Sequence, residues 1–501
     1  MFDNQTRHMR TRRAGRTVAA AWRCAMLLAM VIAVAGCGGG SDSDEGPVTW
    51  SLDGPAPAPA MITGGPWTVA QLAAGNPNPP AVPNKSYGYG ANFMTANAGS
   101  TSPMQPYYFP FIFRDGNVLQ GYFDWRPKDI NEAIVAASSS DDGQTWDFQQ
   151  MALILTEAIP RNPQSTNPDA SLVDNGFGHP TVIRFDHVEA FPTPSPRPGF
   201  EAPTPIHSKT FLYTVDRSTD ALHKSGLVVT PLSPFGDMPL NGAELDIPLL
   251  SDFTDENRVI RTTGLLNPDG ILVVVPDSSP VTVLYIQKIG NGDATGSTTL
   301  PGSQQCGTQP YVPVGASAPN PPFHDLVNVR VAVTYNGIDF FDQGIVAGLN
   351  DQRATSYTGT RWIAPNGTML NLGGGRYGLF FAGGNCMDDD ADAFHYVGYA
   401  ESLEPSMQVW TVLNDIMNPI VSIGPHTVPV DGVPTLIPAQ TPVVGPALHP
   451  FEARVYAPSV IKLDDYTVLL TFAGYHVQNA KDDPLGYRSI QTVRLKASRR
   501  L

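Results

Sequence analysis

Residues 376–383 read Arg-Tyr-Gly-Leu-Phe-Phe-Ala-Gly, an aromatic run bounded by glycine, and similar runs lie on both sides of it. Residues 362–372 precede it across a triple glycine, and residues 394–402 and 409–413 follow it across polar loops. Short β-branched and aromatic runs between glycine-rich turns are typical of antiparallel strands. The segment therefore predicts a meander of three or four strands, which needs further sheets to cover its faces.

The same pattern occurs five times along the chain. Each copy begins with an apolar run that carries a proline, and a second run with Tyr or Phe follows it. Proline is tolerated at the start of a strand, where the sheet does not need its missing N–H group. Five copies predict an all-β, five-bladed β-propeller with the proline-bearing strands innermost, and a β-sandwich is the alternative. The proline-bearing runs are residues 108–113, 178–183, 266–272, 364–369 and 456–461.

The first 36 residues have the pattern of a bacterial signal peptide. Five arginines between residues 10 and 23 precede an apolar run at 25–35, which is too short to span a membrane. Val-Ala-Gly-Cys at 34–37 resembles the lipobox of bacterial lipoproteins. The resemblance implies that Cys37 is acylated, for example with palmitate, and anchors the protein to a membrane of the cell envelope, inner or outer. Ordinary secretion is the alternative.

Composition supports one folded domain after a tether. Residues 37–47 are rich in Gly, Ser and Asp and predict a flexible linker, and residues 48–501 are expected to form the propeller. The chain has 47 glycines and 48 prolines, which suit a turn-rich all-β protein. Its net charge is −15, without a basic cluster beyond the signal, so nucleic acid is not an expected partner. Residues 48–52 are expected to add a strand that completes the last blade.

Two cysteines remain beyond the signal and the lipobox, Cys306 and Cys386. In an oxidising compartment they predict one disulfide, and two buried thiols are the alternative. An acidic loop at residues 388–392 has carboxylates that could hold calcium, but it lacks the Asp-x-Asp-x-Asp-Gly spacing of a calcium loop. A solvated turn is favoured there, and no metal or cofactor is assigned.

Residues 139–146 read Ser-Ser-Asp-Asp-Gly-Gln-Thr-Trp and resemble the Asp-box of sialidases and related propellers. The physical interpretation is a hairpin turn. Asp141 accepts N–H groups of the turn, Gly143 takes a positive φ, and Trp146 packs back on the blade. The resemblance implies a structural role, so Asp141 is not assigned to catalysis. Five copies rather than six, with one good Asp-box, make a sialidase the weaker interpretation.

The repeat region as a whole resembles the five-bladed propeller glycosidases of the arabinanase/β-xylosidase and invertase/levansucrase superfamily. The resemblance rests on the proline-bearing runs and on the fourth-copy ending at residues 397–410. It implies carboxylates on the inner strands, with an Asp directly before the first proline. Here Phe109, His179 and Asn267 precede the first three prolines. None of them can serve as one of the paired acids that glycoside hydrolysis needs.

Other residues are therefore candidates for a site at the propeller axis, which is concave. Asp124 lies on an aromatic second run, and Asp269 follows the third proline; both are predicted as catalytic carboxylates. Asn267 shares a strand face with Asp269, two residues away. His179 either faces the site or bonds to the neighbouring blade. Arginine forks bind carboxylates and acids bind hydroxyl groups. The residues expected to bind substrate are Arg126, His179, Asn267, Arg361, Glu452 and Arg454.

Two classes of function remain. One is a glycoside hydrolase-like envelope protein, which needs two carboxyl groups about 5 to 10 Å apart at the axis. The other is a non-catalytic propeller that binds glycan or protein through His, Asn, Arg and aromatic side chains. The pre-proline residues favour the second class. The chain has no Gly-x-Ser-x-Gly, phosphate-loop or His-Glu-x-x-His motif, which argues against other common chemistries.

Overall fold

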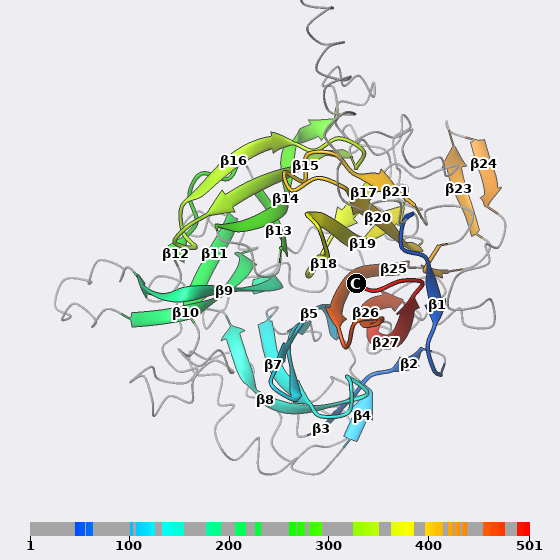
Figure 1. The fold of residues 1–501 in the computed structure, drawn as a ribbon, viewed down its shortest axis with the longest axis horizontal. Coiled ribbons are helices and arrows are strands. Elements are labelled where there is room, and N and C mark those ends of the chain that lie inside the picture. Colours follow the sequence, from blue (N-terminus) through cyan, green and yellow to red (C-terminus); the bar gives the residue numbers. More distant parts are fainter. Residues whose placement is uncertain are drawn as a thin grey trace, which may run out of the picture. The chain divides into compact units, whose positions relative to one another are not determined.

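Five antiparallel sheets surround a common axis in residues 48–501 (Figure 1). The chain divides into two units, Met1–Pro47 and Val48–Leu501. The computed structural model describes residues 46–55, 57–63, 101–103, 107–125, 133–154, 177–191, 206–216, 226–231, 260–266, 268–275, 280–292, 324–349, 362–384, 396–413, 419–423, 426–430, 433–437, 454–475 and 488–501. Within those ranges no helix is long and apolar enough to cross a membrane.

The first three blades are simple meanders whose first strand lies innermost. Blade 1 contains β5 (Tyr107–Asp115), β6 (Val118–Trp125), β7 (Ala133–Ser139) and β8 (Thr145–Ile154). Blade 2 contains β9 (Phe177–Phe191), β10 (Ile206–Asp216), β11 (Gly226–Pro231) and β12 (Ile260–Arg261). Blade 3 contains β13 (Pro268–Val274), β14 (Val281–Gly292), β15 (His324–Thr334) and β16 (Phe340–Ile345).

The last two blades add variations on this plan. Blade 4 contains β17 (Trp362–Pro365), β18 (Leu370–Gly373), β19 (Arg376–Gly384), β20 (Tyr396–Ser402), β21 (Thr411–Val412) and β22 (Val421–Ser422). Blade 5 contains β25 (Arg454–Lys462), β26 (Thr467–Tyr475), β27 (Arg488–Ala497) and β1 (Trp50–Leu52). A separate hairpin pairs β23 (His426–Val430) with β24 (Val433–Ile437). The predicted five-bladed propeller is confirmed.

The inner strand of blade 4 is interrupted, where the sequence predicts one continuous run at 364–369. β17 and β18 both pair with β19, and the backbone between them turns at Gly367 with φ of 74°. A Cβ at Gly367 would lie 2.8 Å from the Cα of Ser459 in blade 5. Glycine is therefore required here both for the positive φ and for the close approach of the next blade.

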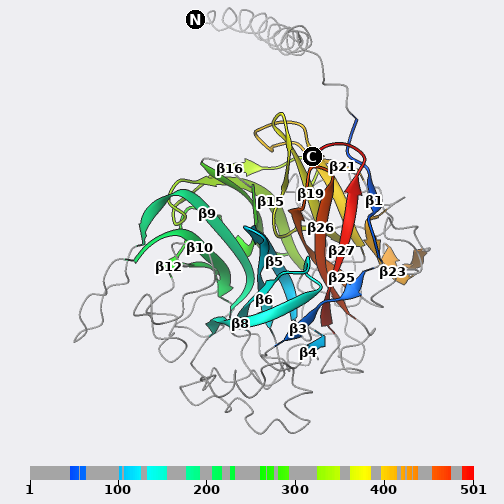
Figure 2. The same ribbon diagram turned by 60° about the horizontal axis from the view of Figure 1, so that its bottom comes forward.

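The N-terminal segment joins the last blade to the first (Figure 2). β1 pairs with β27 as the outer strand of blade 5, and β2 (Ala58–Pro59) continues along β27. β3 (Met61–Thr63) then adds to β8 of blade 1 in parallel and pairs with β4 (Thr101–Pro103). The strand expected at residues 48–52 is confirmed. Residues 48–501 thus contain all five blades and the strands that close them.

Buried Glu401 reinforces this closure. Its carboxylate accepts hydrogen bonds from the backbone N–H of Val48 at 2.7 Å and from the guanidinium of Arg376 at 3.0 Å. The Tyr399 hydroxyl donates a third at 3.1 Å, and Arg499 forms an ion pair at 3.8 Å. One carboxylate therefore ties the first residue of the propeller unit to blade 4 and to the C-terminal segment.

Hydrophobic clusters fill the interfaces between neighbouring blades, because each sheet is apolar on both faces. This explains why each copy of the sequence pattern is apolar on more than alternate residues. Each cluster contains residues of two neighbouring blades, for example Phe111 and Leu212, Phe211 and Val283, Val331 and Phe381, Phe380 and Phe472, and Leu469 and Phe123.

The turn between β7 and β8 has the geometry expected from its residues. Asp141 accepts the Thr145 N–H at 2.8 Å and the Ser139 hydroxyl at 2.8 Å, and Gly143 has a φ of 77°. The buried Trp146 indole donates to the Gly143 carbonyl at 3.0 Å. In blade 4 the indole of Trp410 bonds in the same way to the carbonyl of residue 407 at 2.9 Å. These turns lie at the outer strands, so Asp141 serves the blade and not the axis.

Candidate functional site at the propeller axis

The inner strands run in the same direction around the axis, as the parallel bridge between Val274 and Thr368 illustrates. Side-chain hydrogen bonds tie neighbouring blades together half-way along these strands. Consequently, the strand beginnings gather at one end of the axis and the strand ends gather at the other. The bonds are Ile112 N to Ser459 Oγ at 3.2 Å, Thr181 Oγ1 to the Leu272 carbonyl at 3.0 Å, and Thr368 Oγ1 to the Val460 carbonyl.

Three inner strands carry a bulge directly before their proline. Phe109, His179 and Ala457 have φ of 44°, 55° and 52°, and the ladder shifts register beside each of them. A left-handed backbone is unfavourable for residues with a side chain and is rarer still before proline. A bulge redirects the side chain that it carries, and such strain concentrates at functional sites. The pre-proline positions therefore mark one end of the axis as the candidate site.

Aromatic rings from three blades meet there. The ring of Phe109 lies 3.8 Å from that of His179 in blade 2, centroid to centroid, and 5.4 Å from that of Tyr456 in blade 5. Tyr108 lies 5.4 Å from Phe109 and is fully buried beneath it, whereas Phe109 is partly exposed. The four rings form a wall whose accessible part is Phe109.

Arg454 extends this wall in blade 5. Its guanidinium lies 4.5 Å from the ring centroid of Tyr456 and 5.3 Å from that of Tyr475. It also donates a hydrogen bond to the Tyr475 hydroxyl at 3.0 Å. A guanidinium held over aromatic faces keeps a fixed plane. Arg454 is partly exposed, so it supplies a positive charge and an oriented fork next to the rings.

Asp124 lies fully buried behind His179. Its Oδ1 accepts the backbone N–H of His179 at 2.8 Å, so a carboxylate of β6 holds the bulge of β9 in the next blade. A carboxylate that accepts a backbone N–H is a strong, charge-assisted partner. Both residues were predicted for the site, and this bond joins them. Arg454 is linked to His179 only through the rings of Tyr456 and Phe109. The bond between blades that the sequence suggested for His179 is made by its backbone.

The remaining predicted residues are less completely described. Asp269 lies in β13, one residue after Pro268, and its side chain is outside the described residues. Also outside them are Arg126, Asn267, Arg361 and Glu452, the residues Cys37, Cys306 and Cys386, and the acidic loop at 388–392. In the described part of the chain, no three His, Cys, Asp or Glu side chains are grouped closely enough to hold a metal ion.

Sequence reasoning missed the aromatic members of the site. Tyr108 and Tyr456 occupy the position two residues before the proline of their inner strands, and Tyr475 ends a second strand. The recurrence of tyrosine two residues before proline in blades 1 and 5 was the available signal. An aromatic residue in a strand is ordinarily assigned to the core. Only the arrangement of the blades around the axis shows that these three tyrosines belong to the site.

No family model matches the sequence, and no curated protein matches it. Solved structures with a similar course of the chain include a thermostable family-43 glycoside hydrolase, 13% identical over 79% of this chain and 96% of its own, with a TM-score of 0.41. An α-L-arabinofuranosidase from Lactobacillus brevis is 10% identical over 78% and 92%, with a TM-score of 0.39. An N-acetylgalactosamine deacetylase from F. plautii, in complex with blood group B trisaccharide, is 11% identical over 78% and 95%, also with 0.39.

The sheet order, the ring of inner strands and the N-terminal closure define the class of this protein by themselves. It is a five-bladed β-propeller. Its candidate site lies where blades 1, 2 and 5 meet at the beginnings of their inner strands.

Proposed function

We propose that the axial site binds carbohydrate and that recognition rather than hydrolysis is its main activity. The observation that supports this best is the convergence of the bulged pre-proline positions. They bring together Phe109 and His179, with Ala457 as the third, and not a pair of acids.

The chemistry of the wall suits a sugar. The C–H groups on one face of a pyranose or furanose ring carry partial positive charge, and the π face of Phe109 carries partial negative charge. Arg454 offers N–H donors to hydroxyl groups or, in bidentate fashion, to the carboxylate of an acidic sugar. The buried imidazole of His179 packs against the ring of Phe109 and supports it from blade 2. Neutral and acidic oligosaccharides are therefore the substrate class to test.

The first experiment is a binding screen on lipid-free protein comprising residues 41–501, which include the whole closed propeller. A glycan array is followed by calorimetric titration of the best ligands. Phe109→Ala and Arg454→Gln should each weaken binding about tenfold or more, since each removes a contact of roughly 1 to 3 kcal/mol. Matched controls are Phe341→Ala, an exposed ring on β16, and Arg500→Gln, an exposed arginine, which should leave affinity unchanged.

Reducing-sugar release is measured on the same glycans. Binding without release, weakened by the axial variants and not by the controls, supports the proposal. No binding to any glycan, or binding that the axial variants leave intact, would overturn it.

Hydrolysis is the alternative, and one observation favours it: Asp124 is buried directly behind the aromatic wall. In this version Asp124 and Asp269 are the catalytic carboxylates, and Arg126, Asn267, Arg361 and Glu452 complete the substrate-binding set. Release of sugar that disappears in Asp124→Asn or Asp269→Asn, while folding and glycan binding persist, would establish this version. An Asp141→Asn variant is the control, because that carboxylate serves an outer turn.

We further propose that the protein is a lipoprotein of the bacterial cell envelope, anchored through Cys37. The support is the lipobox-like sequence at 34–37, with the basic and apolar segments before it. Cells fed an alkyne-labelled fatty acid should incorporate label into the wild type and not into Cys37→Ser. Equal labelling of both would contradict the proposal, and the Cys306–Cys386 disulfide is tested separately by thiol alkylation with and without reductant.

A further inference from the structure

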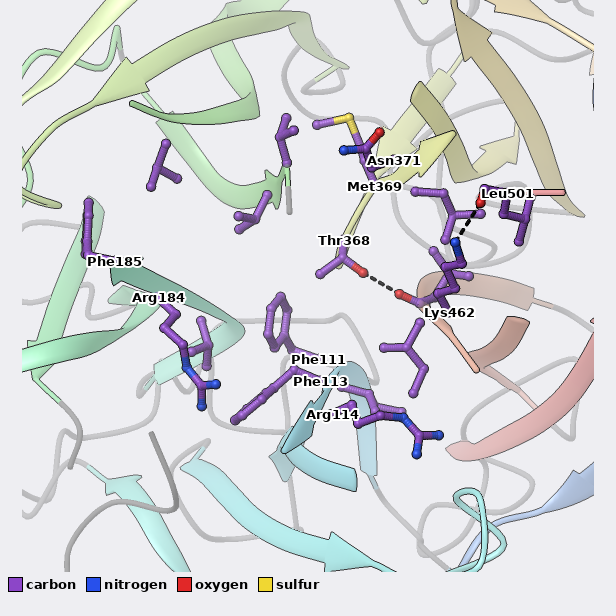
Figure 3. A pocket seen from close by; sticks show the side chains of 18 of the residues that line it. Phe111, Phe113, Arg114, Arg184, Phe185, Thr368, Met369, Asn371, Lys462 and Leu501 are labelled. Carbon is purple, nitrogen blue, oxygen red and sulfur yellow. Dashed lines mark hydrogen bonds between the residues drawn. The ribbon is translucent and has the colours of Figure 1, made fainter. Parts of the chain in front are cut away.

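A cavity of about 970 Å³ opens at the other end of the axis, where the inner strands end (Figure 3). Its lining comes from residues 111–114 of β5, residues 182, 184 and 185 of blade 2, and residues 460–462 of β25, with parts of blades 3 and 4. In blade 5 these positions follow the aromatic wall by four to six residues, and a strand rises about 3.3 Å per residue. In blade 1 the spacing is shorter, because the lining residue Phe111 follows Phe109 by two residues. The inner part of the cavity is thus about 7 Å from the aromatic wall and its rim roughly 15 Å or more, on the opposite side of the wall from the strand beginnings.

The inner surface of this cavity is apolar. It is formed by Phe111, Val182, Val274, Met369 and Val460, all of them buried side chains. The main chain there is already hydrogen-bonded between blades. For example, the Met369 N–H donates to the Val274 carbonyl at 3.0 Å, and the Val274 N–H donates to the Gly367 carbonyl at 3.2 Å. A ligand body that seeks hydrogen bonds would find few partners in this part, whereas a hydrocarbon or aromatic body would be well accommodated.

The charged side chains among the described lining residues are all cationic. They are Arg114, Arg184 and Lys462, and each is exposed. None of the described lining residues is Asp or Glu, although the whole chain carries a net charge of −15. The guanidinium of Arg184 lies 5.6 Å from the ring of Phe113, which places a positive charge beside the apolar surface.

Two of these cations have acidic neighbours outside the lining. Arg114 lies 3.7 Å from Asp142, and Lys462 lies 3.6 Å from Asp465, with both acids about half exposed. Pairs of this kind in water are weak, so they leave the cations able to engage another anion. Lys462 also donates to an oxygen of Leu501, another lining residue, at 2.6 Å, so its ammonium is already engaged and Arg184 is the principal cation for an incoming anion.

From the apolar interior and the cationic rim, we infer that this cavity binds an amphiphilic anion. The ligand class is an alkyl or aryl body inserted among the valines and Phe111, with one carboxylate, sulfonate or phosphate head at Arg184 and its neighbours. The cavity volume lies at the upper end of the range typical of small-ligand pockets, about 300–1,000 Å³, so a chain of medium length fits.

The test uses lipid-free protein, residues 41–501, and two probes. Fluorescence enhancement of 8-anilinonaphthalene-1-sulfonate reports saturable binding, and decanoate below its micelle concentration should displace it. Decyltrimethylammonium has the same tail and the opposite charge, and it should displace the dye at least tenfold less well. Calorimetric titration with decanoate gives the affinity directly.

Variants locate the site. Arg184→Gln should weaken decanoate binding about tenfold, the value of one charge-assisted hydrogen bond. Arg500→Gln, an exposed arginine outside the lining, is the matched control and should bind normally. Asn371→Trp places a large ring at an exposed lining position and should block binding while the melting temperature stays near that of the wild type.

Non-saturable dye binding, equal displacement by the anion and the cation, or wild-type affinity in both Arg184→Gln and Asn371→Trp would overturn the inference. Displacement of the dye by acidic apolar peptides but not by decanoate would also overturn it, because the site would then be a peptide groove. Glycan binding at the other end should be unaffected by these variants, so the two sites are tested separately.

Discussion

Neutralising Glu401 should destabilise the propeller more than any single surface substitution. The carboxylate is 2% exposed and faces two arginines, Arg376 and Arg499, whose side chains are 22% and 13% exposed. In Glu401→Gln the shape is preserved, but both guanidinium groups lose the negative charge of Glu401. Removing one partner of a buried ion pair costs about 3–5 kcal/mol, and the partial exposure of the arginines places the loss near 3 kcal/mol.

The size of the chain sets the thermal shift that this loss produces. Unfolding entropy is about 2.1 cal/mol/K per residue, so a unit of this length changes by roughly 1 kcal/mol for each degree. A loss of about 3 kcal/mol therefore lowers the melting temperature by about 3 °C. Differential scanning calorimetry of residues 41–501 resolves such a shift.

Asp465→Asn is the matched control. That carboxylate also pairs with two cations, Lys462 at 3.6 Å and Arg500 at 2.8 Å, but it is 49% exposed. An exposed pair is worth about 0–1 kcal/mol, so the control should shift by less than about 1 °C, and salt should remove its effect. If Glu401→Gln lowers the melting temperature no more than Asp465→Asn does, the stabilising role assigned to Glu401 is refuted.

Three further outcomes follow from the described contacts. Trp146→Phe removes a buried indole and its hydrogen bond to the Gly143 carbonyl, so denaturant unfolding should show a free energy of unfolding lower by about 2 kcal/mol. An unchanged free energy of unfolding would mean that the indole does not stabilise the turn. Burial opposes ionisation of Asp342, but hydrogen bonds from Arg330 and a tyrosine outweigh it and lower the pKa of Asp342. Its stabilisation is present above the unfolded pKa of about 3.9 and is lost as pH falls through the lowered folded value. The stability difference between wild type and Asp342→Asn should therefore shrink below about pH 4, and a constant difference would contradict this. Gly348→Ala would place a Cβ 1.9 Å from the carbonyl oxygen of Trp410 in the next blade, whereas the Cβ of Gly373→Ala meets open space at a similar positive φ. Calorimetry should show that Gly373→Ala lowers the free energy of unfolding by about 1 kcal/mol and that Gly348→Ala lowers it clearly more.

The architecture could be predicted from the chain because its signals are local. Strands are short apolar runs, turns are glycine-rich, and each inner strand is marked in the sequence by a proline. The closing strand at residues 48–52 was also predictable, since a propeller without it would leave an open edge. The interruption at Gly367 was not, because it depends on how closely Ser459 of the next blade approaches.

The candidate site was predictable only in its ionisable members. Asp124, His179 and Arg454 stand out as polar groups on apolar strands, so they could be named in advance. Tyr456 and Phe109 could not be distinguished from core residues, although their rings lie 5.4 Å apart.

The sequence by itself determined that five similar sheets form, that they close on themselves, and that no acid precedes the first three prolines. Only the tertiary structure decided which side chains meet, because Phe109, His179 and Tyr456 come from three blades far apart in the chain. Their positions are set by the bulges and by the contacts between neighbouring inner strands. The cationic rim of the distal cavity arises in the same way, since Arg114, Arg184 and Lys462 are ordinary surface residues until the strand ends converge.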